Sequence, residues 1–499
     1  MRTRLCAMFA TMAVLGLATC VPMATAHPIE GGELYVPWGE KVGKDRALDL
    51  ARGSAVDAGG GTAGMELVGN VDKDGTVNSD LAFNGNLVYA GNYSGFRILN
   101  ASGSQPTTVT DFACNGPQND VSFHRMGGKT FLFQSIDTAQ TAEDCSSVNA
   151  PIVNGGRVGY EGVRVFDVTN PSQPQFIDMI QTACGSHTHT LIPDGQKAYI
   201  YVSSYPLAGS SITPSTGPGD FRPCQKPHKK ISIIEVSAPG GNFSSRLKEQ
   251  PLADDTPSQN GFDSFQACHD IQILGKKDIA LGSCASGGQL WDVSDPWNPT
   301  TNVPGKYTLI NSPGGGDNFE FIHSGVFAWD GKTFAMMDET GGGGTANCFG
   351  DATTDGFYYF YKLVEPGDPA PTLEARYSIP RPQGQEVCVS HNASVIPVRG
   401  RKLMTASYYQ GGVTVVDFTD LDNIREVAYA DLEDTTGQAD EWSSYWYNGR
   451  IYSNSGLNRR ASNRGVDVFR LTGSLANVTR RAEQWSHSNP QTQEAWQTP

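Results

Sequence analysis

Long apolar runs, closely paired cysteines and positive charge are scarce in this chain of 499 residues. Beyond the first 26 residues no stretch approaches the roughly 20 apolar residues that a membrane-spanning helix needs, so we expect no transmembrane helix. No two cysteines stand in a C-x-x-C spacing, which argues against a zinc ribbon. Lysine and arginine number 37 against 52 aspartates and glutamates, and the net charge of −15 argues against a nucleic-acid partner.

The N-terminus has the pattern of a secretory signal peptide. Residues 1–4 are basic, residues 5–18 are mostly apolar, and residues 24–26 (Ala-Thr-Ala) form a small-x-small cleavage site. We therefore expect the mature chain to begin near His27 and to be secreted. A lipoprotein anchor at Cys20 is the alternative.

Eight cysteines follow the leader: Cys114, Cys145, Cys184, Cys224, Cys268, Cys284, Cys348 and Cys388. An even number of cysteines in an exported chain favours disulfides. The sequence does not fix their connectivity, but pairing neighbours in order would give four local cross-links.

The composition favours short strands over helices. There are 57 glycines, 29 prolines and 10% aromatic residues, with little sign of long amphipathic helices. Such a chain is typical of an all-β protein with many turns.

One short phrase recurs seven times along the chain. It consists of alternating apolar residues, usually introduced by glycine and followed by an acidic or polar turn. The copies lie at residues 95–100, 162–171, 231–236, 288–296, 356–361, 412–420 and 465–470. Their spacing leaves room for four short strands per copy, which is one blade of a β-propeller.

The segments beside each phrase supply the other strands of a blade. Hairpin signals precede the phrases, with Asp-Gly at 194–195 and 330–331 and Asn-Gly at 448–449. A fourth apolar segment usually follows, for example residues 175–180 and 424–429. The sequence therefore predicts an all-β, seven-bladed propeller.

Residues 65–71 resemble a fourth strand without a blade of its own. We predict that they complete the last blade and close the ring, because closure removes an exposed sheet edge. The propeller then spans residues 65–475, after an N-terminal extension at 27–64. Residues 476–499 form a polar tail, whose end at 488–499 we expect to be mobile or to lie across the surface.

The phrases Gly-Val-Arg-Val-Phe-Asp-Val-Thr-Asn-Pro at 162–171 and Gly-Gln-Leu-Trp-Asp-Val-Ser-Asp-Pro at 288–296 resemble the LVIVD repeat of bacterial surface and secreted β-propellers. The resemblance covers most of the mature chain. It implies an architecture and not an activity, because propellers include lyases, oxidases, hydrolases and binding scaffolds.

Histidines recur at the start of the innermost strands. Counting back from the hairpin turns, this position is occupied in four consecutive repeats by His187, His269, His323 and His391. The remaining repeats offer Asp120, Glu441 and, with a small gap, Asp80. Because innermost strands surround the central channel, we expect a ring of imidazoles flanked by carboxylates.

Imidazole and carboxylate are preferred ligands of Zn, Cu, Fe and Mn. The sequence therefore predicts a divalent metal, which it does not identify further, held by residues from the set His187, His269, His323, His391, Glu441 and Asp120. His189 could add a ligand or a hydrogen-bond donor. Hydrogen bonding between blades and a metal-free catalytic pair of histidines are the alternatives.

Two functions fit these features. One is a metal-dependent extracellular enzyme acting on a small molecule or glycan, either an oxidase or oxygenase, or a polysaccharide lyase in which a metal or an arginine offsets a uronate charge. Histidines on successive blades resemble the architecture of iron-dependent carotenoid-type oxygenases, although the sequence phrases of that family are absent. The other function is a non-catalytic binding or adhesion scaffold. We expect a monomer in either case.

Overall fold

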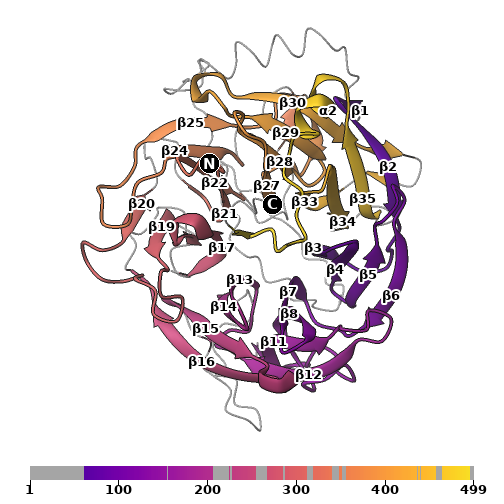
Figure 1. Cartoon of the computed structure of the whole chain (residues 1–499), viewed down its shortest axis with the longest axis vertical. Helices are drawn as coiled ribbons and strands as arrows, with labels where there is room; N and C mark the ends of the chain where they lie inside the picture. Colours follow the sequence, from indigo (N-terminus) through magenta and orange to yellow (C-terminus); the bar gives the residue numbers. More distant parts are fainter. Residues whose placement is uncertain are drawn as a thin grey trace, which may run out of the picture. The chain divides into compact units, whose positions relative to one another are not determined.

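Seven sheets follow one another around a common axis and form a β-propeller (Figure 1). The computed structural model describes residues 61–494 except for 154–155, 206–223, 225–226, 254–266, 285–286, 312–318, 340–347, 351–355, 382, 435–436, 439 and 457–463. The predicted all-β, seven-bladed fold is confirmed.

Blades 1 to 4 each contain four strands in chain order, innermost first. Blade 1 contains β3 (Asn78–Asn84), β4 (Leu87–Asn92), β5 (Gly95–Asn100) and β6 (Thr107–Ala113). Blade 2 contains β7 (Gln118–Met126), β8 (Lys129–Gln140), β11 (Tyr160–Asp167) and β12 (Gln175–Gln181). Blade 3 contains β13 (Thr188–Asp194), β14 (Lys197–Ser203), β15 (Lys230–Ser237) and β16 (Ser244–Pro251). Blade 4 contains β17 (Cys268–Leu274), β18 (Ile279–Cys284), β19 (Gly287–Asp292) and β20 (Thr308–Asn311).

Blades 5 to 7 repeat this order. Blade 5 contains β21 (Ile322–Phe327), β22 (Thr333–Asp338), β24 (Tyr358–Lys362) and β25 (Leu373–Tyr377). Blade 6 contains β27 (Ala393–Ile396), β28 (Leu403–Ser407), β29 (Val413–Asp417) and β30 (Arg425–Asp431). Blade 7 contains β33 (Glu441–Tyr447), β34 (Arg450–Ser455), β35 (Gly465–Leu471) and, from the other end of the chain, β2 (Met65–Val71).

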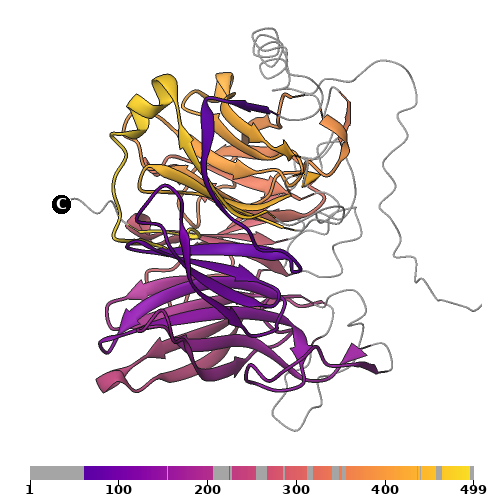
Figure 2. The same ribbon diagram turned by 90° about the vertical axis from the view of Figure 1, so that its right-hand side faces the viewer.

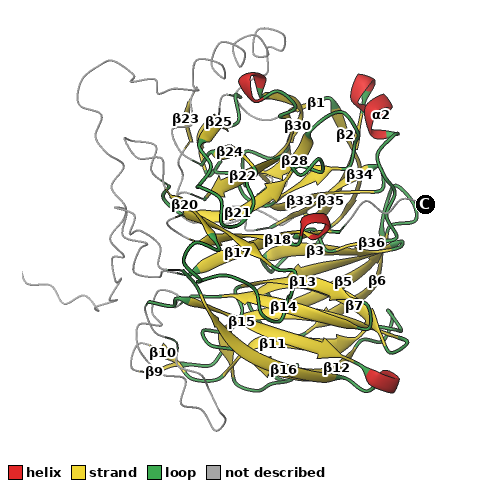
Figure 3. Ribbon diagram, turned by 60° about the vertical axis from the view of Figure 1, so that its left-hand side comes forward, coloured by secondary structure: helices red, strands yellow, loops and turns green. Residues whose placement is uncertain are grey.

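The remaining elements are short (Figure 3). β1 (Gly61–Ala63) extends blade 6 by pairing with β30. Three ribbons pair β9 (Ile152–Val153) with β10 (Gly156–Arg157), β23 (Cys348–Gly350) with β26 (Gln383–Glu386), and β31 (Glu433–Asp434) with β32 (Gly437–Gln438). Within the described residues the helical segments are α2 (Gly473–Thr479) and the 3-10 turns Pro239–Gly241, Gly275–Lys277 and Leu421–Asn423. None of the helices in the described part of the chain has the length and apolarity to cross a membrane.

Each recurring phrase forms the third strand of its blade, and each predicted Gly-containing turn joins two strands of one hairpin. Between β33 and β34, Asn448 and Gly449 both have positive φ, at 47° and 88°. Asparagine and glycine tolerate this conformation, which suits the twist of a two-residue hairpin. Apolar side chains of neighbouring blades then pack against each other, as Phe133 and Val165 of blade 2 do with Ile200 of blade 3.

The ring is closed as predicted. β2 pairs antiparallel with β35, from Met65 opposite Leu471 to Val71 opposite Val466. Strands from both ends of the described chain thus share one sheet, which leaves no open junction between the first and last blades.

Three of the four local disulfides are confirmed, namely Cys114–Cys145, Cys184–Cys224 and Cys268–Cys284. Cys388 is also disulfide-bonded, but the expected Cys348 partner has its side chain outside the described residues.

The segment after α2 crosses the ring from one face and turns toward its centre (Figure 2). β36 (His487–Ser488) pairs with β3, and β37 (Thr492–Gln493) pairs in parallel with β17. Residues 489 and 491–493 are buried, which differs from the expectation that the tail lies across the surface. The physical reason is that innermost strands present free backbone groups to the channel, and these groups need partners when buried.

Candidate metal centre on the propeller axis

The innermost strands shift register close to their first residues. In five blades the pairing with the second strand skips the residues Ser79 and Asp80, Asn119 and Asp120, His269 and Asp270, His323, and Trp442. Such a bulge re-aims the side chains that it leaves unpaired. All of the skipped residues except Asn119 line a cavity on the axis.

The rings of the four predicted histidines lie next to one another in a row. Their ring centroids are 4.5 Å apart for His187 and His269, 3.8 Å for His269 and His323, and 4.1 Å for His323 and His391. The structure therefore brings together side chains from four successive blades.

A carboxylate that the sequence interpretation missed joins this row. Glu339 directly follows β22 and lies with Oε2 3.8 Å from His323 Nε2 and Oε1 3.6 Å from His391 Nε2. The Tyr409 hydroxyl donates a hydrogen bond to Glu339 Oε1. Because Ile322 pairs with Asp338 across the hairpin, the end of β22 faces the start of β21. Following that pairing from the histidine position would have pointed to Glu339.

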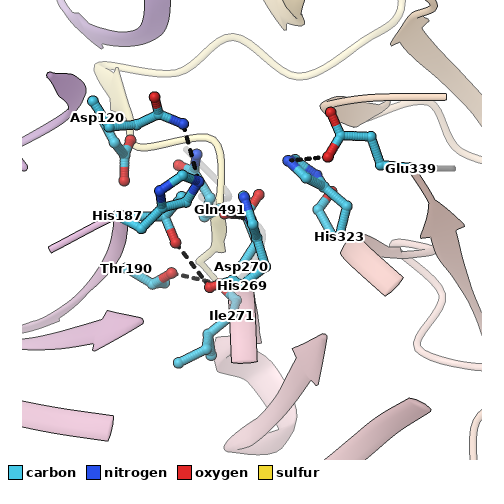
Figure 4. A network of polar contacts seen from close by, with 12 residues as sticks. Asp120, His187, Thr190, His269, Asp270, Ile271, His323, Glu339 and Gln491 are labelled. Atoms are coloured by element: carbon cyan, nitrogen blue, oxygen red, sulfur yellow. Dashed lines mark hydrogen bonds and ion pairs between the residues drawn. The ribbon is translucent and has the colours of Figure 1, made fainter. Parts of the chain in front are cut away.

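Two overlapping groups have ligand geometry. His269, Asp270 and His323 form one, and His323, Glu339 and His391 form the other; within each group the ligand atoms lie within 4.8 Å of one another. Figure 4 shows the contact between Glu339 and His323, with His269 and Asp270 nearby. His323 is common to both groups.

Burial keeps these imidazoles neutral. It lowers the pKa values of His269 and His323 well below their usual range and that of His391 to about 3. A neutral imidazole retains the lone pair that a metal ion needs. Burial raises the pKa of Glu339 to about 8, so an ion bound here would have to displace a proton from that carboxyl.

Hydrogen bonds orient the outer members of the row. His391 Nδ1 contacts the carbonyl oxygen of Trp442, which leaves Nε2 facing Glu339. His323 Nδ1 is buried and has no hydrogen-bond partner among the described residues. A ligand bound to Nδ1 would remove the free-energy cost of burying this nitrogen without a hydrogen-bond partner.

His187 has different surroundings. Its Nδ1 lies 2.7 Å from Asp137 Oδ2, and its Nε2 lies 3.1 Å both from the Tyr205 hydroxyl and from Gln118 Nε2. With Nδ1 donating to the carboxylate, Nε2 accepts from the other two groups. His187 thus adjoins the two ligand groups without belonging to either. Its side chain is 12% exposed, which is more than the side chains of the other three histidines.

The other predicted residues belong to neither ligand group. In blade 7 the register shift leaves Trp442 unpaired instead of Glu441, and Trp442 lines the cavity. Glu441 bonds to the Ser453 hydroxyl within its own blade. Asp120 Oδ2 accepts a hydrogen bond of 2.6 Å from the His189 amide. The His189 ring lies between the hydroxyls of Ser122 and Ser135, at 2.7 Å and 2.8 Å. His189 therefore joins blade 3 to blade 2. It does not share the surroundings of His187, two positions earlier.

No family model and no curated protein matches this chain, so the LVIVD character of the repeat stays a prediction. Among solved structures, the β-propeller domain of Cps50 (Swd1) from Myceliophteria thermophila matches 81% of this chain and 99% of its own length, at 10% identity and a TM-score of 0.46. The computationally designed Ika8 protein matches the same shares, at 12% identity and a TM-score of 0.39. Neither similarity bears on function.

Proposed function

We propose that this chain holds one divalent transition-metal ion on the propeller axis, with His269, His323 and His391 as imidazole ligands and Glu339 as the carboxylate ligand. The observation that carries the proposal is the position of His323, whose buried, neutral ring belongs to both ligand groups. Three imidazoles and one carboxylate suit Zn, Cu, Fe or Mn. A thiolate ligand is not part of the set, because Cys268 beside His269 is in a disulfide.

The proposed role is that of a secreted metal-dependent enzyme of the oxidase or oxygenase class. When bound, the ion would supply Lewis acidity and, for Fe or Cu, one-electron chemistry. His187, hydrogen-bonded to Asp137, lies beside the ligands and would hold or pass a proton at Nε2.

The lining of the cavity favours this class over a polysaccharide lyase. Its described residues include Asp80, Asp120 and Asp270 but neither lysine nor arginine. A uronate would therefore find no cationic side chain among these residues to offset its negative charge.

The wider proposal follows the sequence. A signal peptide at 1–26 would direct the chain out of the cytoplasm, where an LVIVD-type propeller would act as a monomer. The disulfides support this placement, because such bonds persist in oxidising compartments.

The test is metal analysis of the purified mature protein beside two variants, His323→Ala and His124→Ala. His124 lies in β7 and bonds to the carbonyl of Gly195, away from the cavity, so it is the matched control. We expect a stoichiometric metal in the parent and in His124→Ala and its loss from His323→Ala. Absence of stoichiometric metal from all three proteins after loading with Zn, Cu, Fe and Mn would refute the proposal.

The assignment as an enzyme is tested separately from metal binding. A loaded protein that consumes oxygen in the presence of a small-molecule panel, with a rate lost in His323→Ala, supports the oxidase class. Full loading without turnover on oxygen or glycan panels favours the binding scaffold.

A further inference from the structure

One buried tyrosine beside the candidate metal centre has a role that the ligand set does not explain. Tyr409 lies on the turn between β28 and β29 and is buried. Its φ of 48° is in the left-handed region, which is unusual and costly for an aromatic residue. Such a conformation persists only where the surrounding structure enforces it.

Hydrogen bonds on both sides fix this turn. The Tyr409 carbonyl accepts from the Gly412 amide at 3.0 Å and from the Glu441 amide of blade 7 at 2.9 Å. On the other side, the Gln410 amide donates to the Val387 carbonyl at 2.9 Å, and the Gln410 side chain accepts from the Val387 amide at 2.9 Å. The backbone of Tyr409 is therefore held in place at the junction of blades 6 and 7.

The side chain of Tyr409 points at Glu339. Its hydroxyl donates a hydrogen bond to Oε1 of this carboxyl. Its ring centroid lies 4.7 Å from that of His391 and 6.5 Å from that of Trp442, which leaves the hydroxyl little freedom to turn away. A tyrosine hydroxyl is protonated at neutral pH, and burial beside a carboxylate favours that state, so the hydroxyl acts as a donor.

Both oxygens of Glu339 lie near imidazole nitrogens. Oε2 is 3.8 Å from His323 Nε2, and Oε1 is 3.6 Å from His391 Nε2. A carboxylate in this position could bind an ion through both oxygens, and its backbone is fixed, since the Glu339 amide donates to the Phe321 carbonyl at 2.9 Å. The Tyr409 hydroxyl competes for the lone pairs of Oε1 only, which makes the two oxygens unequal as ligands.

We infer that Tyr409 is a positioning residue that makes Glu339 bind the proposed ion through Oε2 alone, and that it thereby selects an ion of low coordination number. The inference rests on the proposed function, because it concerns the same ion. Three imidazoles and one carboxylate oxygen make four protein ligands, the number that Zn²⁺ prefers. A second carboxylate oxygen would favour Mn²⁺, which is suited to more oxygen ligands in octahedral geometry.

The neighbouring Tyr408 provides a matched control. It is also fully buried, and its hydroxyl has no hydrogen-bond partner among the described residues. Its ring packs in the core formed by blades 5 and 6 and belongs to neither ligand group. Tyr408→Phe and Tyr409→Phe therefore remove the same atom from adjacent residues, and only the second change removes the bond to Glu339.

The experiment measures the affinities for Zn²⁺ and Mn²⁺ in the parent and in both variants, and the visible absorption of each protein loaded with Co²⁺. Sites of this kind bind Zn²⁺ more tightly than Mn²⁺ in any case, so the informative quantity is the change in the affinity ratio. In Tyr409→Phe the ratio of Zn²⁺ to Mn²⁺ affinity should fall by at least about tenfold, as on loss of a group that orients a metal ligand. The Co²⁺ absorption should weaken, because a higher coordination number reduces its intensity. Tyr408→Phe should match the parent in both measurements.

A double-mutant cycle tests whether Tyr409 acts through Glu339. At saturating Co²⁺, Tyr409→Phe should no longer change the absorption spectrum once Glu339→Gln is present. A change of the same size in both backgrounds would show that Tyr409 acts on the ion by another route and would overturn the inference.

The parent protein alone also tests the inference, in case a variant fails to fold. A charge-transfer band from phenolate to metal in the Cu²⁺-loaded parent would show that a tyrosine is itself a ligand, against the donor role of Tyr409. Equal affinity ratios in Tyr408→Phe and Tyr409→Phe would overturn the inference and leave the proposed ion in place. A parent that binds no transition metal would instead remove the proposed function, and this inference with it.

Discussion

Two arcs of the ring face each other across the axis and differ in chemistry. The histidine arc comprises blades 3 to 6, which carry His187, His269, His323 and His391 at the channel. The acidic arc comprises blades 7, 1 and 2, which carry Glu441, Asp80 and Asp120 near the same level. In the histidine arc the rings of His269, His323 and His391 lie tilted against one another, and His323 and His391 share Glu339. In the acidic arc only Asp80 and Asp120 face each other, because Glu441 bonds within its own blade.

This difference follows from the register of the innermost strands. In blade 5 the register shift leaves His323 unpaired, whereas in blade 7 it leaves Trp442 unpaired, and Glu441 one position earlier pairs with Ser455 and bonds to the Ser453 hydroxyl. The histidine arc is also completed from outside the repeat position, by Glu339 directly after a second strand.

The largest expected effect concerns the disulfides of the two arcs. Cys268–Cys284 lies beside His269, and Cys114–Cys145 joins the residue after β6 of blade 1 to the segment between β8 and β11 of blade 2. Replacing either pair by alanine should lower the free energy of unfolding by about 3 kcal/mol, because the unfolded chain gains entropy. Only the first replacement should also weaken transition-metal binding. Denaturant unfolding and equilibrium dialysis measure the two effects, and equal metal affinity in both variants would contradict the special position of Cys268.

Next in size is a comparison of two buried glutamates. Burial raises the pKa of both Glu339 and Glu441 to about 8, yet only Glu339 contacts the imidazoles. Glu339→Gln should weaken Zn²⁺ binding by at least about 10- to 100-fold, because that range is already typical for loss of a group that only orients a metal ligand. Glu441→Gln should leave the affinity unchanged. A loss of affinity in Glu441→Gln would mean that the acidic arc takes part in the imidazole site.

The same glutamates predict how stability changes with pH. Their folded pKa of about 8 exceeds the ordinary 4.5, so the folded state holds protons that the unfolded state has released. Metal-free protein should therefore lose about 2 kcal/mol per glutamate between pH 6.5 and 8, and each Glu→Gln variant should lack its share. Below pH 6.5 the trend reverses, because unfolded histidines bind protons while buried His391, with a pKa of about 3, does not. Urea unfolding at a series of pH values measures both slopes; an unchanged slope in Glu441→Gln would contradict the assignment.

The sequence predicted the features that repeat. Seven phrases, the Asn448-Gly449 turn and the unpaired segment at 65–71 were sufficient for the blade count and the closing strand. Local cysteine pairing followed from neighbouring positions. The convergence of four histidines followed from their common place in the repeat. Each of these depends on periodicity, which a single sequence displays directly.

Features that do not follow the sequence repeat could not be predicted in the same way. Glu339 is the only member of its site that comes from a second strand, and finding it requires the pairing of Ile322 with Asp338. The polar composition of residues 489–493 did not predict their burial. In the structure Asn489 and Gln493 bond to backbone groups of innermost strands, and Gln491 donates to the Asp80 side chain. The pairing of Asp80 with Asp120 depends on two register shifts that no local pattern marks.

The smallest expected effect compares how the C-terminal segment holds the two arcs. Asn489 exchanges two hydrogen bonds with the backbone of Phe123 in blade 2, both 3.0 Å long. Gln493 does the same with Phe327 in blade 5, at 3.1 Å and 2.8 Å. Each amide therefore occupies one buried N–H and one buried carbonyl of an innermost strand, as an additional strand would.

Because the hydrogen bonds of Asn489 and Gln493 are chemically equivalent, Asn489→Ala and Gln493→Ala should each lower the free energy of unfolding by about 1 kcal/mol. Neither change should alter metal binding, since the segment supplies no imidazole or carboxylate to the histidine row. Thermal unfolding in the metal-free and metal-loaded states measures both quantities. If Gln493→Ala alone reduced metal affinity, the segment would be positioning the innermost strand of blade 5, and through it His323, so the two arcs would differ in their support as well as in their ligands.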